Sequence, residues 1–313
     1  MNRARLWRLV QALLFGALLV WIGRELVQQR DALRAAAGQL DVRWGLIAAA
    51  SALVFITYAA LIQSWRMLMA GWGTSLSYGA AVRVWTTANL GRYIPGKVWS
   101  VGALAVLAQR EGASAVGATG AALLGTLLNL GAGFGVVAVI GPTVLDALGP
   151  QYRIVAWIAL AVFVVGVLLL PRLLPPIVRA ITQRRGGVTE PVAPLPATLV
   201  WGAVAINAAS WIGYGIAFQL LAHALLPSAS GATLGFIAIW TASYLVGYLV
   251  LVAPGGLGAR EAAMVAAFGA LGLAGPAEAT VLAVASRLWL LVLEVLPGLI
   301  SLALAPGVRA RSR

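Results

Sequence analysis

The chain has 313 residues, of which 61% are hydrophobic and 10% are charged, and its mean hydropathy is +0.94. This balance excludes a soluble domain and predicts one all-α polytopic membrane domain over residues 1–313. Long apolar runs exclude a transmembrane barrel, whose strands alternate every second residue. The sequence has no cysteine, which excludes disulfides and thiolate chemistry. The net charge of +13 is typical of cytoplasmic loops facing anionic lipid, so we expect no nucleic-acid partner.

Apolar runs predict six membrane spans, at 7–27, 44–65, 116–140, 154–173, 197–222 and 278–304. The first resembles a signal anchor, and we expect it to be retained because no small-residue cleavage pattern follows it. Two further segments, 79–109 and 233–272, each contain two short apolar pieces around a break. Each half therefore reads as span, span, broken helix pair, span. We predict two repeats, over about 7–140 and 154–304, joined by a proline-rich cytoplasmic linker at about 174–196.

The distribution of arginine predicts the orientation of these spans. The N-terminus, the 174–196 linker and the C-terminus are rich in arginine, which the positive-inside rule assigns to the cytoplasm. The spans then fit only if each broken pair begins and ends on one side, the first on the cytoplasmic side and the second outside. The halves would have opposite orientations, as in the inverted repeats of secondary transporters. Whether each broken pair is re-entrant or fully spanning stays open at this point.

The two breaks share a proline–glycine pattern. Arg92-Tyr93-Ile94-Pro95-Gly96-Lys97 interrupts the first pair, and Pro254-Gly255-Gly256 precedes Arg260-Glu261 in the second. Proline cannot continue a helix, and glycine leaves backbone groups uncovered. Each following helix would direct uncapped N–H groups and the positive end of its dipole into the break.

The charged residues at membrane depth are functional candidates, and positive charge exceeds negative charge among them. Because arginine donates two hydrogen bonds to phosphate at once, we predict a site for an anionic head group. The predicted ligands are Arg92, Lys97, Arg260 and Glu261, and the predicted breaks are Pro95, Gly96, Pro254, Gly255 and Gly256. The secondary candidates are Arg83, Asn89, Arg287 and Glu294.

Two other interpretations of these residues stay open. The charges could pair internally, joining Arg260 or Arg287 to Glu261 or Glu294; Arg287 and Glu294 lie seven residues apart on one helical face. The proline–glycine breaks could also simply shape the fold. The sequence contains no metal-ligand cluster, nucleophile–base pair or phosphate-binding loop, so we expect no metal, no cofactor and no soluble-type catalytic site.

The segment Pro254-Gly255-Gly256-Leu257-Gly258-Ala259-Arg260-Glu261 resembles the signature of the lysylphosphatidylglycerol synthase transmembrane-region family. Arg92-Tyr93-Ile94-Pro95-Gly96-Lys97 is similar to that family's N-terminal motif, and the resemblance covers essentially the whole chain. It implies the flippase part of the bifunctional members, without their soluble synthase domain. It also implies that the residues of the two motifs lie at the site.

The leading hypothesis is a translocase that moves an anionic phospholipid or polyprenyl-phosphate-linked lipid across the bacterial inner membrane, with both termini cytoplasmic. The alternatives are a non-transporting scaffold for an envelope glycosyltransferase, and an intramembrane lipid-modifying enzyme using Glu261 or Glu294 as general base. The expected partners are an anionic lipid and an envelope glycosyltransferase or lipid-modifying enzyme. The lipid, the direction, the coupling ion and a homo-oligomeric state stay open.

Overall fold

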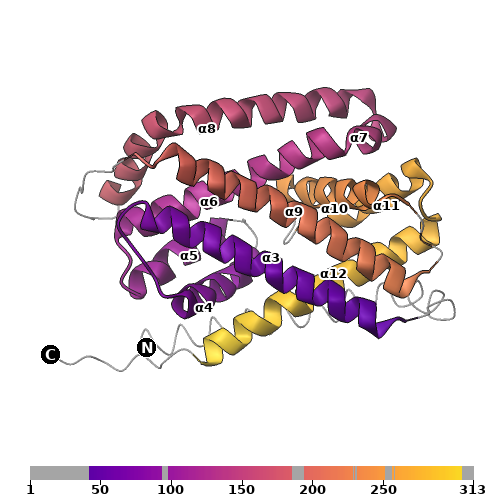
Figure 1. Cartoon of the computed structure of the whole chain (residues 1–313), viewed down its shortest axis with the longest axis horizontal. Coiled ribbons are helices and arrows are strands. Elements are labelled where there is room, and N and C mark those ends of the chain that lie inside the picture. The colour runs from indigo at the N-terminus through magenta and orange to yellow at the C-terminus, as the bar shows by residue number, and fades with distance from the viewer. Residues whose placement is uncertain are drawn as a thin grey trace.

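The computed structural model of the protein describes residues 42–93, 98–184, 194–227, 229, 231–250, 256 and 258–304. These described residues form helices and contain no strand, which confirms the predicted all-α class (Figure 1). The helices are α3 (Trp44–Ala70), α4 (Tyr78–Asn89), the 3-10 helix η1 (Leu90–Tyr93), α5 (Val98–Arg110), α6 (Ala115–Ile140), α7 (Pro142–Leu148), α8 (Pro150–Arg184), α9 (Ala197–Leu225), α10 (Thr233–Leu249), α11 (Ala259–Leu271) and α12 (Pro276–Ala303).

Five helices in the described part of the chain are long and apolar enough to cross a membrane: α3, α6, the Pro150–Leu169 part of α8, α9 and α12. They correspond to the last five predicted spans, so hydropathy located each of them within a few residues. The first predicted span, 7–27, lies outside the described residues. The protein is thus a multi-pass membrane protein.

Each segment predicted to be a broken helix pair consists of short helices. The first comprises α4, η1 and α5, and the second comprises α10 and α11. The pairs pack against helices of the opposite half of the chain, because α4 contacts α12 and α10 contacts α6. Between them, α3 and α9 form the most extensive helix contact of the described structure. This packing places the open ends of both pairs in the middle of the molecule (Figure 1).

One stretch differs from the prediction. Helix α8 continues to Arg184 through Pro175 and Pro176, so the expected linker is helical over its first part. A short helix, α7, follows α6 directly, and Pro142 occupies its first helical position.

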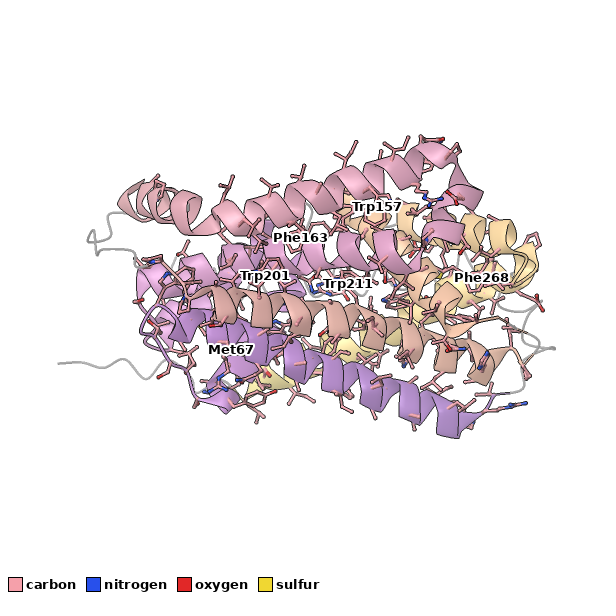
Figure 2. The ribbon with its side chains drawn as sticks, turned by 45° about the horizontal axis from the view of Figure 1, so that its top comes forward. Met67, Trp157, Phe163, Trp201, Trp211 and Phe268 are labelled. Atoms are coloured by element: carbon pink, nitrogen blue, oxygen red, sulfur yellow. The ribbon has the colours of Figure 1, made fainter. Side chains whose placement is uncertain are left out.

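Small and amide residues bring the long helices together. Asn129 Nδ2 donates to Asn207 Oδ1 at 2.9 Å, and Asn207 Nδ2 donates to Ser64 Oγ at 3.1 Å. These bonds connect α6, α9 and α3, because polar side chains within membrane helices form hydrogen bonds across helices. At Gly131 of α6, the ring of Phe163 from α8 occupies the space that a Cβ atom would need (Figure 2). Glycine therefore allows the close contact between α6 and α8.

Candidate functional site

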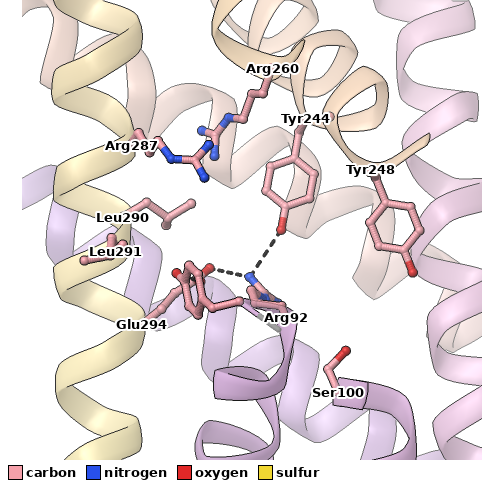
Figure 3. A pocket seen from close by; sticks show the side chains of 11 residues that line it. Arg92, Ser100, Tyr244, Tyr248, Arg260, Arg287, Leu290, Leu291 and Glu294 are labelled. Atoms are coloured by element: carbon pink, nitrogen blue, oxygen red, sulfur yellow. Dashed lines mark hydrogen bonds and ion pairs between the residues drawn. The ribbon is translucent and has the colours of Figure 1, made fainter. Parts of the chain in front are cut away.

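A cavity of about 90 Å³ lies where both broken pairs meet α12 (Figure 3). Residues from η1, α5, α10, α11 and α12 line it, so its wall combines segments that are distant in sequence. The lining residues are Arg92, Tyr93, Ser100, Tyr244, Gly247, Tyr248, Arg260, Arg287, Leu290, Leu291 and Glu294. Three of the four arginines that the sequence singled out therefore face one small space.

Arg260 is the cation of this cavity that is least compensated. Its residue surface is 6% exposed, and its guanidinium lies over the rings of Trp240, at 4.4 Å, and Tyr244, at 5.1 Å. Within the described part of the chain, its Nη2 atom has no hydrogen-bond partner and no carboxylate lies within 4.0 Å of it. Aromatic faces attract a desolvated cation with roughly 2 kcal/mol. They cannot accept the directed hydrogen bonds that an anion would accept.

Glu261, next in sequence, pairs with Arg287, which is one of the internal pairings that the sequence left open. Its Oε1 atom forms an ion pair with Arg287 Nη1 at 2.6 Å, and its Oε2 atom accepts a hydrogen bond from the Gly258 N–H at 2.7 Å. The other pairing left open for this carboxylate, with Arg260, does not form. Adjacent helical residues do not face each other, so the carboxylate covers the start of α11 while Arg260 faces the aromatic rings. At the start of α11, this carboxylate thus satisfies one backbone N–H group, that of Gly258.

Glu294 is the acceptor of a second buried network. Its Oε1 atom forms an ion pair with Arg92 and accepts a hydrogen bond from Tyr58 Oη at 3.3 Å. Its Oε2 atom accepts one from Tyr93 Oη at 2.6 Å. The expected alternative, pairing along α12 between Arg287 and Glu294, is not what forms. Each of them instead pairs across to a residue of a broken pair.

Arg92 donates hydrogen bonds to three side chains: a carboxylate, an amide and a phenol. Besides Glu294, it donates to Asn89 Oδ1 at 3.2 Å. It also donates to Tyr244 Oη at 3.2 Å (Figure 3). Asn89, a secondary candidate, thus positions Arg92. Tyr244 contacts Arg92 through its hydroxyl and Arg260 through its ring, and sequence reasoning missed it. Its position four residues after Trp240, on the same helical face of α10, was the available signal.

Not every predicted site residue reaches this cavity. Arg83 forms an ion pair with Glu111 at 3.4 Å, with side chains 40% and 36% exposed, and it does not line the cavity. Solvent screening leaves such a pair with little energetic weight, so Arg83 is not part of this site. The predicted residues Pro95, Gly96, Lys97, Pro254 and Gly255 lie outside the described residues.

Gly256, the described residue of the second break, determines how closely α10 and α11 approach. Its φ is +74°, and a Cβ atom there would lie 2.7 Å from Gly247 Cα. A Cβ atom on Gly247 would in turn lie 2.8 Å from Arg260 Cβ. These two glycines therefore allow the backbone contact that positions Arg260.

We expect Gly256→Ala to destabilise the protein by about 1–3 kcal/mol, because it adds a backbone clash and a left-handed strain. The measurement is thermal unfolding in detergent, followed by tryptophan fluorescence. Gly269→Ala is the matched control, since Gly269 is in α11 and a Cβ atom there has no neighbour within 4 Å. Equal unfolding temperatures for the two variants would contradict this role of Gly256.

Comparison with known proteins was made for the whole chain. No curated protein sequence matches it. A family model described as the lysylphosphatidylglycerol synthase TM region matches residues 8–298. This range includes every residue that lines the cavity and almost all of the sequence, and it confirms the resemblance carried by the two proline–glycine motifs. The chain therefore belongs to the lysylphosphatidylglycerol synthase transmembrane-region family.

Proposed function

We propose that the protein is a lipid translocase that moves an anionic phospholipid or a polyprenyl-phosphate-linked lipid across the bacterial inner membrane. The observation that carries this proposal is Arg260, a buried guanidinium in the cavity wall with an unsatisfied Nη2 donor. An ionisable group at membrane depth is costly unless it is paired or functional. A lipid phosphate supplies both the missing acceptor and the missing negative charge.

The second arginine of the cavity strengthens this assignment. Arg287 lies on the same side of the cavity as Arg260, and their guanidinium groups approach each other in Figure 3. One carboxylate, Glu261, is within ion-pair distance of Arg287. Two adjacent guanidinium groups, of which Glu261 pairs with Arg287 alone, repel each other in a low dielectric. An anion between them would relieve this repulsion and accept hydrogen bonds from both planar forks.

The cavity size restricts what it holds. Pockets that enclose a whole small molecule measure roughly 300–1,000 Å³, whereas this one measures about 90 Å³. We infer that the phosphate part of the head group occupies the cavity. The acyl or polyprenyl chains remain among the surrounding apolar helices and in lipid.

Movement across the membrane would come from rocking of two inverted repeats. In support, the reciprocal contacts α4–α12 and α10–α6 relate the two broken pairs to each other, and Arg92 and Arg260 converge from one pair each. In this arrangement the broken pairs are re-entrant from opposite sides, and the N-terminus, the 174–196 linker and the C-terminus are cytoplasmic. Alternating access around a fixed midplane site is the mechanism typical of such repeats.

The test is reconstitution of the purified protein in liposomes with fluorescently labelled phosphatidylglycerol or labelled polyprenyl phosphate. We expect one of these lipids to cross faster than in protein-free liposomes, and Arg260→Ala to remove the difference. No acceleration for either lipid would contradict the proposal. Chemical turnover of lipid in detergent would favour the enzyme alternative, and full cellular function of Arg260→Ala would favour the scaffold.

A further inference from the structure

We propose that Glu294 takes up one proton when the cavity binds its anion, so that a proton moves together with the lipid. This coupling rests on the proposed anion site and adds the coupling ion to it. Three features of the described structure lead to it. They are the position of this carboxylate, the cation that it occupies, and the hydrogen bonds that remain to it when that cation leaves.

Glu294 is the carboxylate that faces the proposed ligand. It is the acidic residue among the described residues that line the cavity, and its side chain is 5% exposed. It lies on α12, which packs against α4 and η1 of the first broken pair and against α11 of the second. Because the cavity measures about 90 Å³, a phosphate bound there lies close to this carboxylate. Two like charges close together in a buried site disfavour the ionised form of one of them.

Arg92 is the cation that the ligand and Glu294 would share. Within the described part of the chain it is the residue that forms an ion pair with Glu294, and it also lines the cavity. The arginine side chain is 29% exposed, so the guanidinium is more accessible to an entering anion than the carboxylate behind it. Phosphate and carboxylate accept hydrogen bonds from the same planar fork. An anion bound to Arg92 therefore displaces the carboxylate from it.

The remaining contacts of Glu294 suit a neutral carboxylic acid. Tyr58 Oη lies 3.3 Å from Oε1, and Tyr93 Oη lies 2.6 Å from Oε2. A phenol can donate or accept a hydrogen bond. After Arg92 leaves, Oε1 takes a proton from water and donates it in a hydrogen bond to Tyr58 Oη, while Oε2 still accepts from Tyr93; no other bond changes. The neutral acid stays hydrogen-bonded, whereas the ionised form would be buried without a cation, which is costly.

The other titratable and charged groups around Glu294 keep their charge near neutral pH. Phenols remain neutral and guanidinium groups remain charged there. Glu261, the other carboxylate of this region, does not line the cavity and is paired with Arg287. Glu294 is thus the described group of the cavity wall whose charge can change. The groups that face it in the described structure are Tyr58 of α3, Arg92 and Tyr93 of η1, Tyr214 of α9, Tyr244 of α10, Arg260 of α11 and Arg287 of α12.

The direct test measures the protons that are taken up on binding. Short-chain phosphatidylglycerol is titrated into the full-length protein in non-ionic detergent, in a weakly buffered solution that contains a pH-indicator dye. This lipid is a phosphodiester and does not itself titrate near neutral pH. We expect uptake of about one proton per bound lipid at about pH 6.5.

The pH dependence of the affinity is an independent readout. Because binding takes up a proton, the affinity increases as the pH falls and decreases as the pH rises. We expect binding to weaken by up to about tenfold per pH unit above about pH 6.5, the limit for one proton per lipid. Binding without proton uptake, at an affinity that does not change with pH, would overturn the inference.

Three variants assign the proton to one carboxylate. Glu294→Gln has the shape of the neutral acid and no proton to gain, so we expect it to bind the lipid without proton uptake. Glu261→Gln changes the other carboxylate of this region, and Glu111→Gln changes an exposed ion pair outside the cavity. Each should still take up about one proton per bound lipid. Uptake that persists in Glu294→Gln and is lost in Glu261→Gln would overturn the role of Glu294. The wild-type titration decides the coupling even if a variant does not fold.

Transport separates this inference from the proposed function. In liposomes with labelled phosphatidylglycerol, an imposed pH gradient is expected to change the net distribution of the lipid between leaflets with the wild-type protein and not with Glu294→Gln. Lipid movement that ignores the gradient would overturn the coupling and leave translocation. Proton-coupled binding without lipid movement would do the reverse. Absence of phosphatidylglycerol binding would overturn the coupling, whereas the polyprenyl phosphate would still test the proposed function.

Discussion

Replacing Arg260 with alanine is expected to weaken the binding of anionic lipid at least a hundredfold without unfolding the protein. A loss of two or more charge-assisted hydrogen bonds, at about 1.5–3 kcal/mol each, accounts for this factor. The change also removes the contacts with Trp240 and Tyr244, worth roughly 2 kcal/mol. Removal of a buried and incompletely paired charge offsets that loss. The measurements are lipid affinity in nanodiscs and thermal unfolding in detergent.

Arg83→Ala is the control for the removal of an arginine, because Arg83 is exposed and pairs with Glu111 away from the cavity. Its lipid affinity is expected to remain within about twofold of the wild-type value, as for other exposed ion pairs. Wild-type affinity in Arg260→Ala would contradict the site. If Arg260→Ala instead lost about 3–5 kcal/mol of stability, Arg260 would have a structural role.

Replacing Glu294 with alanine is expected to destabilise the protein by about 3–5 kcal/mol, the largest stability effect of any single change at the cavity. The glutamate side chain is 5% exposed and accepts from Arg92, Tyr93 and Tyr58. Its removal leaves the partly buried Arg92 without its carboxylate and two phenol groups without their acceptor. The measurement is the unfolding temperature in detergent, compared with that of Glu111→Ala, for which we expect about 0–1 kcal/mol.

A double-mutant cycle separates the ion pair from simple loss of packing. Arg92→Gln combined with Glu294→Gln removes both charges and retains hydrogen-bonding groups, so it should recover most of the stability lost in Glu294→Gln alone. A coupling energy of at least 1 kcal/mol between the two positions is expected for a buried pair in contact. Strictly additive effects would contradict the network around Glu294.

The sequence predicted the positions of the helices better than it predicted which charged residues pair. Apolar run length located α3, α6, α8, α9 and α12, because about 20 apolar residues are needed to cross the hydrocarbon core whatever the tertiary contacts. The prolines and glycines of the breaks predicted the two interrupted pairs, because both residue types disfavour a continuous helix. These features depend on the chain itself and on the lipid around it.

The pairing of charges could not be predicted, because it depends on which faces of distant helices meet. Arg287 and Glu294 lie on one face of α12 but do not pair with each other. Arg287 pairs with Glu261, and Glu294 pairs with Arg92. Arg83 has the same side chain as the cavity arginines, and only its position near Glu111 shows that it belongs to the surface. The extension of α8 to Arg184 was missed because Pro175 and Pro176 were interpreted as the start of a loop.

Tyr244 contacts both arginines that come from the broken pairs, one through its ring and the other through its hydroxyl. The positions of the Arg92 and Arg260 guanidinium groups are therefore thermodynamically linked through the side chain of Tyr244. A change in the position of one guanidinium alters the contacts available to the other. If a shift of Arg92 strengthens anion binding at Arg260, then anion binding at Arg260 favours that shift of Arg92. By reciprocity, the two effects have the same free energy.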